Sequence, residues 1–561
     1  MFQANGFDEI GARGGGNTSA GGLGGVLEVR NNTRNLNSYL TLNGNKKFGD
    51  FNLSATLGNE VVENRTQNAQ VIGKELVVRG FNQIANAKTY TPTTGFSKRR
   101  IVGLFGDVVL DYKSWVSLNL KARNDFVSTL ALDNNSVFYP AAALSLIPTE
   151  MFPSLKSDFV NLIKVRANYG IVGNSPGAYN TSDYLLQGNP NDGFGPSIVF
   201  PFNQQLGFTL SNAAGNPLLV PEFTTEWEIG TDLAFWNNRF TVEANYYERE
   251  LTEGLFSVPF SAASGITSVF LNAGVLKTKG SELAIGITPI KAKSGFTWTL
   301  NGNYTQYHTI VEKLAPGVAN IFLGGFTTPN VRLVAGEEFG QLYGSKYRRD
   351  AQGRLLLQTT GPTAGLPLAT TDVQNIGNPN PKFTIGITNT IIYKGFDFSL
   401  LFDIREGGDI YSRNLADLRR NGVVAETAEF ARFDKDGNPA KPYKFDGVDA
   451  AGNVVNIPVT AEQYWGNNGK YVAAEGFIVN TSWVRLREAN LTYRLPKKLI
   501  DKLPFGNIEF GVFGRNLFLW TKEYKHLDPE QNALGISAAQ GLEFNAQPST
   551  RTVGVNLRLT L

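Results

Sequence analysis

The sequence has no cysteine, only two histidines and no long apolar run among its 561 residues. The lack of cysteine excludes a disulfide framework and any zinc or iron–sulfur site built on cysteine ligands. His308 and His526 lie far apart and show no metal-ligand spacing, so we expect them at polar loop or strand-end positions. The lack of a run of about eighteen apolar residues excludes transmembrane helices.

The sequence also lacks an excess of charge of either sign. The 52 Lys and Arg residues nearly balance the 49 Asp and Glu residues, which gives a formal net charge of +3. No basic cluster typical of nucleic-acid binding is present, so we expect no nucleic-acid partner. No Ser/His arrangement or acid pair stands out at a strand end either, so we predict that the protein is not an enzyme and has no cofactor.

What the sequence does have is alternation, clearest in its last thirteen residues, 549–561. Successive side chains of a strand point to opposite faces. One face of this segment is apolar, with Val553, Val555, Leu557, Leu559 and Leu561. The other face is polar or small, with Thr552, Gly554, Asn556, Arg558 and Thr560. Such a segment is typical of a membrane β-barrel strand, although a strand of a soluble sandwich reads the same.

The same alternation recurs with charged residues inside the strands. In Leu162–Ile171, Lys164 and Arg166 alternate with apolar residues, and in Phe223–Phe235, Glu226 and Glu228 do so. Charged side chains are costly in the dry core of a sandwich but suit a water-filled lumen. We therefore predict an all-β fold, a transmembrane antiparallel β-barrel.

The connections between predicted strands alternate between short and long. Short turns follow Asn43, Leu110, Phe235, Ile290, Tyr393 and Leu495, with a compact helical link at Pro148–Asn161. Long segments are 59–96, 172–222, 252–270, 310–380, 406–480 and 519–548. Outer-membrane barrels have short periplasmic turns and longer extracellular loops. Aromatic residues beside the short turns suit an interfacial girdle: Tyr112, Trp115, Trp236, Phe296, Tyr393 and Phe396.

This pattern predicts about fifteen membrane strands, the first of them Leu36–Gly44, which would run from outside to inside. Residues 1–35 are rich in Gly and Asn and are predicted to be a remnant of an extracellular loop, followed by the barrel domain at 36–561. The N-terminus has no signal peptide, which an outer-membrane protein needs. We therefore expect the chain to be the later part of a longer precursor.

Several stretches resemble the SusC/RagA-type TonB-dependent outer-membrane transporters. The segment LIKVRANYGIVGN resembles the family signature K-R-x-x-Y-G-x-x-G-N, and the preceding FYPAAALSLIPTEMFPS is similar to a family run in which Trp is usual at Leu146. Further similar stretches follow in family order: Leu271–Ile285, Ile376–Ile387, Trp483–Pro496, Gly514–Glu530 and the C-terminal PSTRTVGVNLRL. A terminal Phe is usual where this chain has Leu561.

The resemblance implies a bacterial outer-membrane barrel of about 22 strands with a plugged lumen, of which this chain would hold the later strands. It implies import of oligosaccharides or peptides with a SusD-like lipoprotein, driven by TonB through a plug that would precede Met1. Two alternatives stay open. One is an outer-membrane barrel that serves as a surface adhesin or structural protein, and the other is a soluble all-β carbohydrate-binding protein.

Aromatic residues in two long loops are the candidate substrate-binding residues, because sugar faces stack on aromatic rings. They are Tyr464, Trp465, Tyr471, Trp520 and Tyr524. The alternative is that they form small cores of the loops themselves. Asp434, Asp436 and Asn438 have the alternate spacing of a weak calcium-loop candidate, but Asp-Gly turns are the simpler interpretation, so no metal is predicted.

Overall fold

The computed structural model describes residues 2–3, 7–10, 25–78, 80–188, 200–430, 443–525, 527–535 and 537–561. The chain divides into two compact units. Unit 1 comprises Met1–Leu144, Tyr169–Thr225 and Glu253–Asn272, and unit 2 comprises Ser145–Asn168, Glu226–Thr252 and Ala273–Leu561. No helix among the described residues is long and apolar enough to cross a membrane.

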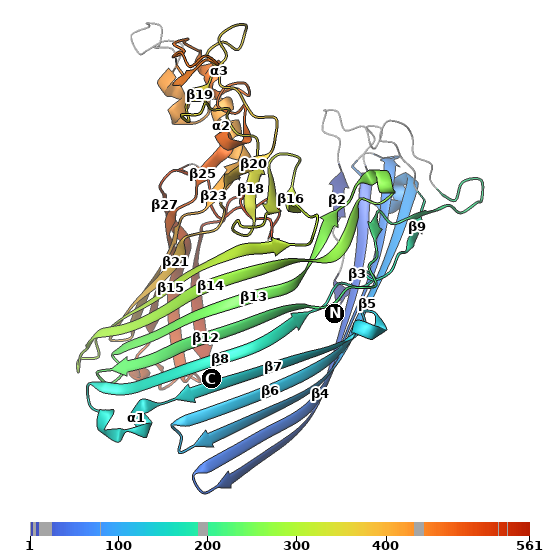
Figure 1. Ribbon diagram of the computed structural model, residues 1–561. Coiled ribbons are helices and arrows are strands. Elements are labelled where there is room, and N and C mark those ends of the chain that lie inside the picture. Colours follow the sequence, from blue (N-terminus) through green and yellow to red (C-terminus); the bar gives the residue numbers. More distant parts are fainter. Residues whose placement is uncertain are drawn as a thin grey trace. The chain divides into compact units, whose positions relative to one another are not determined.

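The strands of the main sheet follow the chain order, as the colours of Figure 1 show. Unit 1 holds β3 (Gly25–Phe48), β4 (Phe51–Leu76), β5 (Ala87–Tyr112), β6 (Val116–Val127) and most of β7 (Ser136–Leu146). Four strands run through both units: β8 (Val160–Asn174), β12 (Glu222–Phe235), β13 (Phe240–Pro259) and β14 (Ser268–Lys291). Unit 2 holds β15 (Thr297–Leu314), β21 (Phe383–Tyr393), β22 (Phe396–Glu406), β26 (Trp483–Arg494), β27 (Asn507–Thr521) and β29 (Thr552–Thr560).

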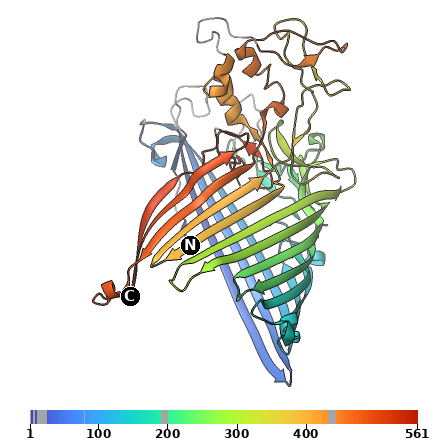
Figure 2. The same ribbon diagram turned by 90° about the vertical axis from the view of Figure 1, so that its left-hand side faces the viewer.

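The sheet has 18 described strands, of which β1 (Phe2–Gln3), β2 (Phe7–Ile10) and β11 (Ala213–Ala214) are short. The other fifteen agree with the predicted number of about fifteen. Neighbours from β3 to β6 pair antiparallel, and so do the strands from β14 to β29 in unit 2. Figure 2 shows the orange-to-red strands of unit 2 side by side. The all-β antiparallel prediction is confirmed.

The register of β27 and β29 confirms that these strands have two different faces. Ile508 pairs with Leu559, Phe510 with Leu557, and Val512 with Val555, so one face is apolar across both strands. Glu509 pairs with Arg558, and Gly511 with Asn556, on the opposite face. We call these the apolar face and the polar face of the sheet.

The tight turns follow from residues that accept positive φ. Lys394 (φ 47°) and Gly395 (φ 88°) join β21 to β22 as predicted, in the left-handed backbone that a two-residue hairpin turn requires. Trp236, Asn237 and Asn238 also have positive φ between β12 and β13. The prediction that the first short turn follows Asn43 is wrong, because β3 continues to Phe48 and the turn lies at Gly49 and Asp50.

Aromatic rings gather beside these turns, as the predicted girdle requires. The ring centroids lie 4.7 Å apart for Phe51 and Tyr112, and 5.4 Å apart for Tyr112 and Trp115. Three more pairs of rings are in contact beside other turns: Phe159–Trp236, Phe296–Tyr393 and Phe396–Tyr493. Rings of this kind favour the membrane–water interface because they combine an apolar body with a polar edge.

The prediction of a long loop at 59–96 is wrong. β4 extends to Leu76 and β5 begins at Ala87, so only 77–86 connect them. Residues 25–35 likewise belong to β3 and not to a loop. The reason is that polar residues occupy both faces of these strand ends, which removes the alternation while the ladder of hydrogen bonds continues. The predicted boundary between a remnant at 1–35 and a barrel domain at 36–561 therefore falls inside β3, and the assignment of the two parts as a loop remnant and a barrel domain stays a prediction.

The short elements lie in the connections. The predicted helical link contains α1 (Pro148–Met151) and a 3₁₀ turn at Pro153–Leu155, and α4 (Lys497–Ile500) follows β26. β9 (Leu185–Gln187) pairs with β10 (Phe208–Leu210). In unit 2, β16 (Ile321–Gly325), β17 (Asn330–Leu333), β18 (Gln341–Gly344) and β20 (Gln374–Gly377) form a four-stranded sheet. β23 (Asp409–Ser412), β25 (Ile478–Asn480) and β28 (Leu542–Glu543) form another, and β19 (Leu355–Leu356) pairs with β24 (Gly447–Val448).

We call the described residues of 315–382, 407–482 and 522–551 the loop assembly, which also contains α2 (Arg413–Arg420) and α3 (Ala461–Trp465). Strand pairs link the three segments, since β19 of the first pairs with β24 of the second, and β23 of the second pairs with β28 of the third. Figure 1 shows the assembly at the ends of β15, β21 and β27. The small strands expected within 310–380 are present and stay within this loop, as β18 and β19 show.

Candidate functional site

The polar face of unit 2 carries a network of charged side chains. The Arg166 guanidinium pairs with Asp232, lies 2.7 Å from Glu243 and donates to Asn245 Oδ1 at 2.6 Å. A Cβ on Gly230 would lie 2.9 Å from Arg166 Nε, so the glycine leaves room for the guanidinium. This face therefore presents fixed, paired charges.

The neighbouring apolar residues point the other way. Val165 is 36% exposed and Ile229 is 51% exposed, although each lies directly next to a residue of the network, Arg166 or Glu228. The predicted separation of charged and apolar side chains is thus present in the middle of the chain as well as at its C-terminal end.

The loop assembly has its own hydrophobic core. Its buried residues come from all three segments: Val331, Leu342, Ile376, Tyr411, Ala416, Trp465, Tyr471, Ala474, Phe477, Ala539 and Leu542. The Tyr411 and Phe477 rings stack with centroids 4.6 Å apart. Loops that share a packed core cannot move independently, so the assembly is a platform and not a set of separate loops.

Cations are packed against aromatic rings inside this core. Arg419 pairs with Glu426 and lies 5.4 Å from the Trp465 ring centroid, and Lys470 Nζ lies at the same distance from that ring. Burial, followed by the charge of Arg419, lowers the pKa of Lys470 below its ordinary value. Burial likewise raises the pKa of the Tyr471 phenol.

A buried ion pair anchors the third segment to the end of β26. Arg485 and Asp528 have side chains 2% and 6% exposed, and Arg485 Nη2 lies 2.6 Å from Asp528 Oδ1. Asp528 also accepts the backbone N–H of Ser549 at 3.0 Å. Burial raises the pKa of Asp528, but hydrogen bonds from Ser549, Glu530 and Arg485 outweigh it, so this pKa lies below its ordinary value. We call this the Arg485–Asp528 anchor.

Three of the five predicted aromatic residues are buried. Trp465 is 8% exposed, Tyr471 is 5% exposed, and Tyr524 is inaccessible, with its hydroxyl 2.8 Å from Ser412 Oγ. A sugar needs an open ring face, which these rings lack. The structure therefore favours the alternative interpretation, in which they form the core of the loops.

The other two residues are placed differently. The Tyr464 ring already stacks on Tyr443 at 3.9 Å and on Phe445 at 4.6 Å. Trp520 is 53% exposed in β27 and pairs with Val484, on the face opposite to the buried Arg485. Trp520 thus lies on the apolar face, where an interfacial aromatic residue belongs.

The weak calcium candidate, Asp434, Asp436 and Asn438, lies outside the described residues, as does His526. Elsewhere in the part of the chain that the structure describes, no group of three or more His, Cys, Asp or Glu side chains could hold a metal ion.

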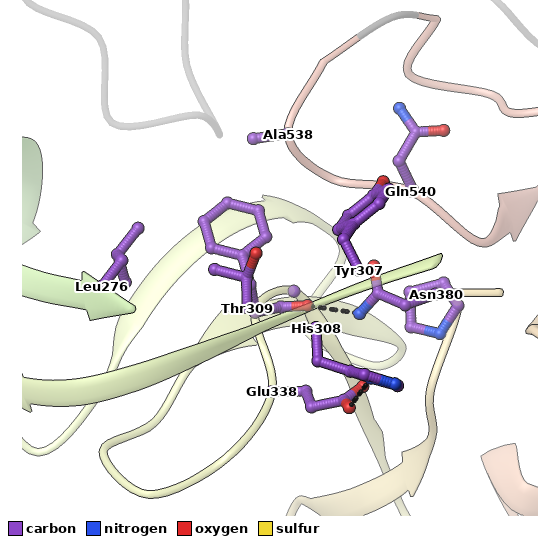
Figure 3. A pocket seen from close by; sticks show the side chains of 11 residues that line it. Leu276, Tyr307, His308, Thr309, Glu338, Asn380, Ala538 and Gln540 are labelled. Carbon is purple, nitrogen blue, oxygen red and sulfur yellow. Dashed lines mark hydrogen bonds and ion pairs between the residues drawn. The ribbon is translucent and has the colours of Figure 1, made fainter. Parts of the chain in front are cut away.

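A cavity of about 330 Å³ opens between β15 and the loop assembly (Figure 3). Its lining combines Leu276, Tyr307, His308, Thr309, Glu338, Phe339, Gly340, Pro379, Asn380, Ala538 and Gln540. His308 Nδ1 lies 2.9 Å from Glu338 Oε1, and Asn380 Nδ2 donates to the Phe339 carbonyl at 2.8 Å. Its size is that of a small-ligand site.

The chemistry of this cavity is that of binding. Figure 3 shows Tyr307 and Thr309 on one side of β15 and the paired His308 and Glu338 on the other side. The phenol of Tyr307 and the amides of Asn380 and Gln540 can exchange hydrogen bonds with hydroxyl or amide groups of a ligand. Sequence reasoning missed this site because its residues come from five separate stretches of the chain, and only the pairing of β15 with the loops brings them together. His308 lies towards the end of β15, at the polar strand-end position expected of it.

Comparisons with known proteins agree with this architecture. The family described as "TonB dependent receptor-like, beta-barrel" matches residues 3–517. TonB-dependent receptors P3 and P26 of Formosa agariphila are each 27% identical over 576 residues, which cover 96% of this chain and 54% of theirs. The chain spans about half the length of the curated relatives it matches.

Solved structures show the same fold. The structure of the RagAB peptide transporter matches with a TM-score of 0.71 at 18% identity, over 96% of this chain and 56% of that one. The RagAB peptide importer in the "closed-closed" state matches with a TM-score of 0.72 at 19% identity, over 95% and 56%.

Proposed function

The chain belongs to the TonB-dependent receptor-like β-barrel family of the bacterial outer membrane, and we propose that it forms the barrel part of an importer for oligosaccharides or peptides that works with a SusD-like surface lipoprotein. Members of this family are receptors and transporters, not enzymes. The membership also excludes the alternative of a soluble carbohydrate-binding protein.

The single observation that carries the proposal is the loop assembly with its cavity. The shared core holds the loops as one platform, and the cavity beside it presents Tyr307, Asn380 and Gln540. Peptides and oligosaccharides both carry amide or hydroxyl groups that such side chains bind. A large packed outer surface also suits contact with a lipoprotein that would cover the barrel.

The polar face supports the part of the proposal that concerns TonB. In the family, TonB acts through a plug inside the barrel. The paired charges around Arg166 offer hydrogen-bonding partners to such a plug while they satisfy each other in its absence. We propose that the complete protein receives its plug on this face.

The substrate-binding role of the aromatic residues is kept as a prediction for Tyr464, which is partly exposed. Trp520 lies on the apolar face, where an interfacial role fits it better. Calcium binding at Asp434, Asp436 and Asn438 also stays a prediction. Neither is needed for the proposal, which depends on the cavity and the platform.

Uptake by cells tests the proposal. The full-length gene is deleted and complemented, and uptake of fluorescent oligosaccharide and peptide pools is measured with and without a protonophore. We expect uptake of either the oligosaccharide pool or the peptide pool to be abolished, and the deletion and the protonophore to abolish uptake of the same pool. We expect the double variant Tyr307→Phe/Gln540→Ala to reduce uptake about tenfold or more, because hydrogen bonds to a bound ligand are removed.

Lys156→Gln is the matched control, since Lys156 forms an exposed pair with Glu150 in the helical link far along the chain from the cavity residues. Unchanged uptake in the deletion strain, together with lost attachment to surfaces, would instead identify the barrel as an adhesin.

A further inference from the structure

The apolar face of β4 and β5 in unit 1 ends abruptly at a row of cations. From the turn upward, this face of β4 shows Phe51, Leu53, Ala55, Leu57, Asn59 and Val61. Glu63 follows on the same face, and then Arg65. Across the ladders Arg65 pairs with Arg34 of β3 on one side and with Lys98 of β5 on the other. Three positive side chains thus form one row across three strands, the cation row.

The length of the apolar stretch places this row at the membrane surface. A tilted membrane strand crosses the hydrocarbon with about 9–11 residues, and the apolar band of such barrels is about 25 Å tall. The stretch from Phe51 to Val61 has this length. Glu63 therefore lies at its upper edge, and Arg65 lies one step higher, about 7 Å along the strand. This is the level of lipid headgroups at the end of the barrel away from the short turns.

The described residues do not balance all the charges of the row. Like charges directly opposite each other on adjacent strands are destabilising. Glu63, only 8% exposed, lies 3.3 Å from Lys98 and also pairs with Arg100. Among the described residues, Arg34 and Arg65 form no ion pair. The sheet therefore holds an excess of positive charge at one height.

The guanidinium of Arg65 is also oriented by an aromatic ring. It lies 5.2 Å from the Phe96 ring centroid, and its side chain forms no hydrogen bond or ion pair with the described residues. Stacking on an aromatic face orients a guanidinium without using its N–H groups. The guanidinium of Arg65 is thus oriented, and the described residues supply no acceptor for it.

A cavity of about 470 Å³ lies directly above the row on the same face. Side chains of β3, β4 and β5 line it, among them Arg30, Asn32, Gln67, Thr94 and Phe96. Amide and hydroxyl groups around an arginine suit the polar headgroup of a lipid better than they suit its acyl chains. The apolar stretch below the row suits the acyl chains.

We propose that Arg34 and Arg65, which have no carboxylate partner among the described residues, bind the phosphate group of an outer-leaflet lipid beside Lys98, with the lipid's acyl chains along the apolar face of β4 and β5. Arginine binds phosphate through two parallel N–H bonds, and a phosphate would neutralise the repulsion within the row. The proposal rests on the placement of the barrel in the outer membrane and not on what the protein transports.

Unit 2 supplies an internal contrast. Its apolar face also ends in charges, but Lys279 lies 2.9 Å from Glu248, and Lys277 lies 2.7 Å from Glu312. Each of these lysines has a carboxylate partner, so no binding of anionic lipid is expected there. Lys279→Gln is therefore the matched control for substitutions in the cation row.

The test measures lipid binding by the full-length protein in detergent and in phosphatidylcholine nanodiscs. The probes are lipid A with its phosphates, lipid A stripped of its phosphates, and inorganic phosphate. We expect the double variant Arg34→Gln/Arg65→Gln to bind phosphorylated lipid A about 25-fold more weakly, since each cation near a membrane surface contributes about a fivefold factor. Lys279→Gln should bind as the wild type does, and high salt should weaken wild-type binding.

Heat-modifiable mobility on gels establishes that each variant is folded, and the salt dependence of the wild type tests the site even if the double variant fails to fold. Equal binding of phosphorylated and stripped lipid A by the wild type would overturn the proposal. So would unchanged binding by a folded double variant. Competition by inorganic phosphate at the same concentration as the lipid would show a free-anion site and would also overturn it.

Discussion

Removal of the Asp528 carboxylate is expected to release the segment 522–549 from the end of β26. Arg485 would keep its charge at 2% exposure, and the 2.6 Å contact would be lost. Breaking a buried ion pair by removing one partner costs about 3–5 kcal/mol, because the remaining charge is left buried and unpaired. Glu530 lies 3.2 Å from Arg485 and can take over part of the pairing. We therefore expect a loss of about 3 kcal/mol for Asp528→Ala.

Hydrogen exchange followed by mass spectrometry measures this loss locally, without unfolding the barrel. A change of about 3 kcal/mol corresponds to roughly 100-fold faster exchange in peptides from 522–549, while peptides from β29 serve as reference. The double variant Arg485→Met/Asp528→Ala should recover most of the protection, since it leaves no unpaired charge. Lys156→Gln removes an exposed pair and should change protection by less than about 1 kcal/mol.

The reasoning would be refuted by an Asp528→Ala variant whose exchange in 522–549 rises less than about fivefold. The reasoning would also fail if the Arg485→Met/Asp528→Ala variant exchanged as fast as the Asp528→Ala variant. The loss of stability would then come from lost packing and not from an uncompensated charge.

Three further predictions concern pH, the sheet faces and a turn. The pKa of Asp528 lies below its ordinary value of 3.8, so the Arg485–Asp528 anchor contributes its full stability above that pH. This contribution is lost as the pH falls through the lower pKa of the folded state. Protease cleavage within 522–549 should therefore become faster along a descending pH series. Val555→Arg, on the apolar face, should cost about 2–4 kcal/mol of folding free energy in lipid vesicles, and Asn556→Arg about 1 kcal/mol or less. Gly395→Ala should cost more than about 1 kcal/mol because of its φ of 88°, whereas Gly44→Ala, with no atom within 4 Å of the added Cβ, should be near neutral in the same assay.

Each of these has an outcome that contradicts it. Cleavage that does not change with pH would separate the anchor from the charge of Asp528. Equal costs for the two arginine substitutions would remove the distinction between the faces. Equal costs at Gly395 and Gly44 would mean that backbone conformation does not limit the turn.

The faces of the strands could be predicted from the sequence because their cause is local. A residue such as Val165 between Lys164 and Arg166 must face away from them in any strand. The short turns were predictable for the same reason, since Lys394-Gly395 is a sequence that accepts two residues of positive φ. The resemblance to a known family then assigned the alternation to a membrane barrel.

The strand ends beyond the membrane could not be predicted, because alternation fails there. Above Val61 both faces of β4 meet polar surroundings, so Glu63, Arg65 and Gln67 read as a loop although they continue the ladder. Hydrogen bonding of the backbone, which has no signature in side-chain polarity, decides the length of these strands.

The loop assembly shows a second limit. Rings that bind a sugar and rings that fill a loop core look the same in a sequence, and only burial separates them, as it does for Trp465 and Tyr524. The cavity around His308 was out of reach for another reason, since its residues come together only when separate loops pack.

The account depends most on the claim that alternate residues of each strand face lipid, and the absence of cysteine makes a direct measurement possible. Single cysteines are introduced at successive positions from 51 to 61 in the full-length protein, labelled with a fluorophore and exposed to a quencher confined to lipid. Strong quenching at odd positions and weak quenching at even positions is the predicted result, because Leu53 and Leu57 lie on the apolar face and Ser54 and Glu60 on the polar face. Quenching without a period of two residues would contradict the account.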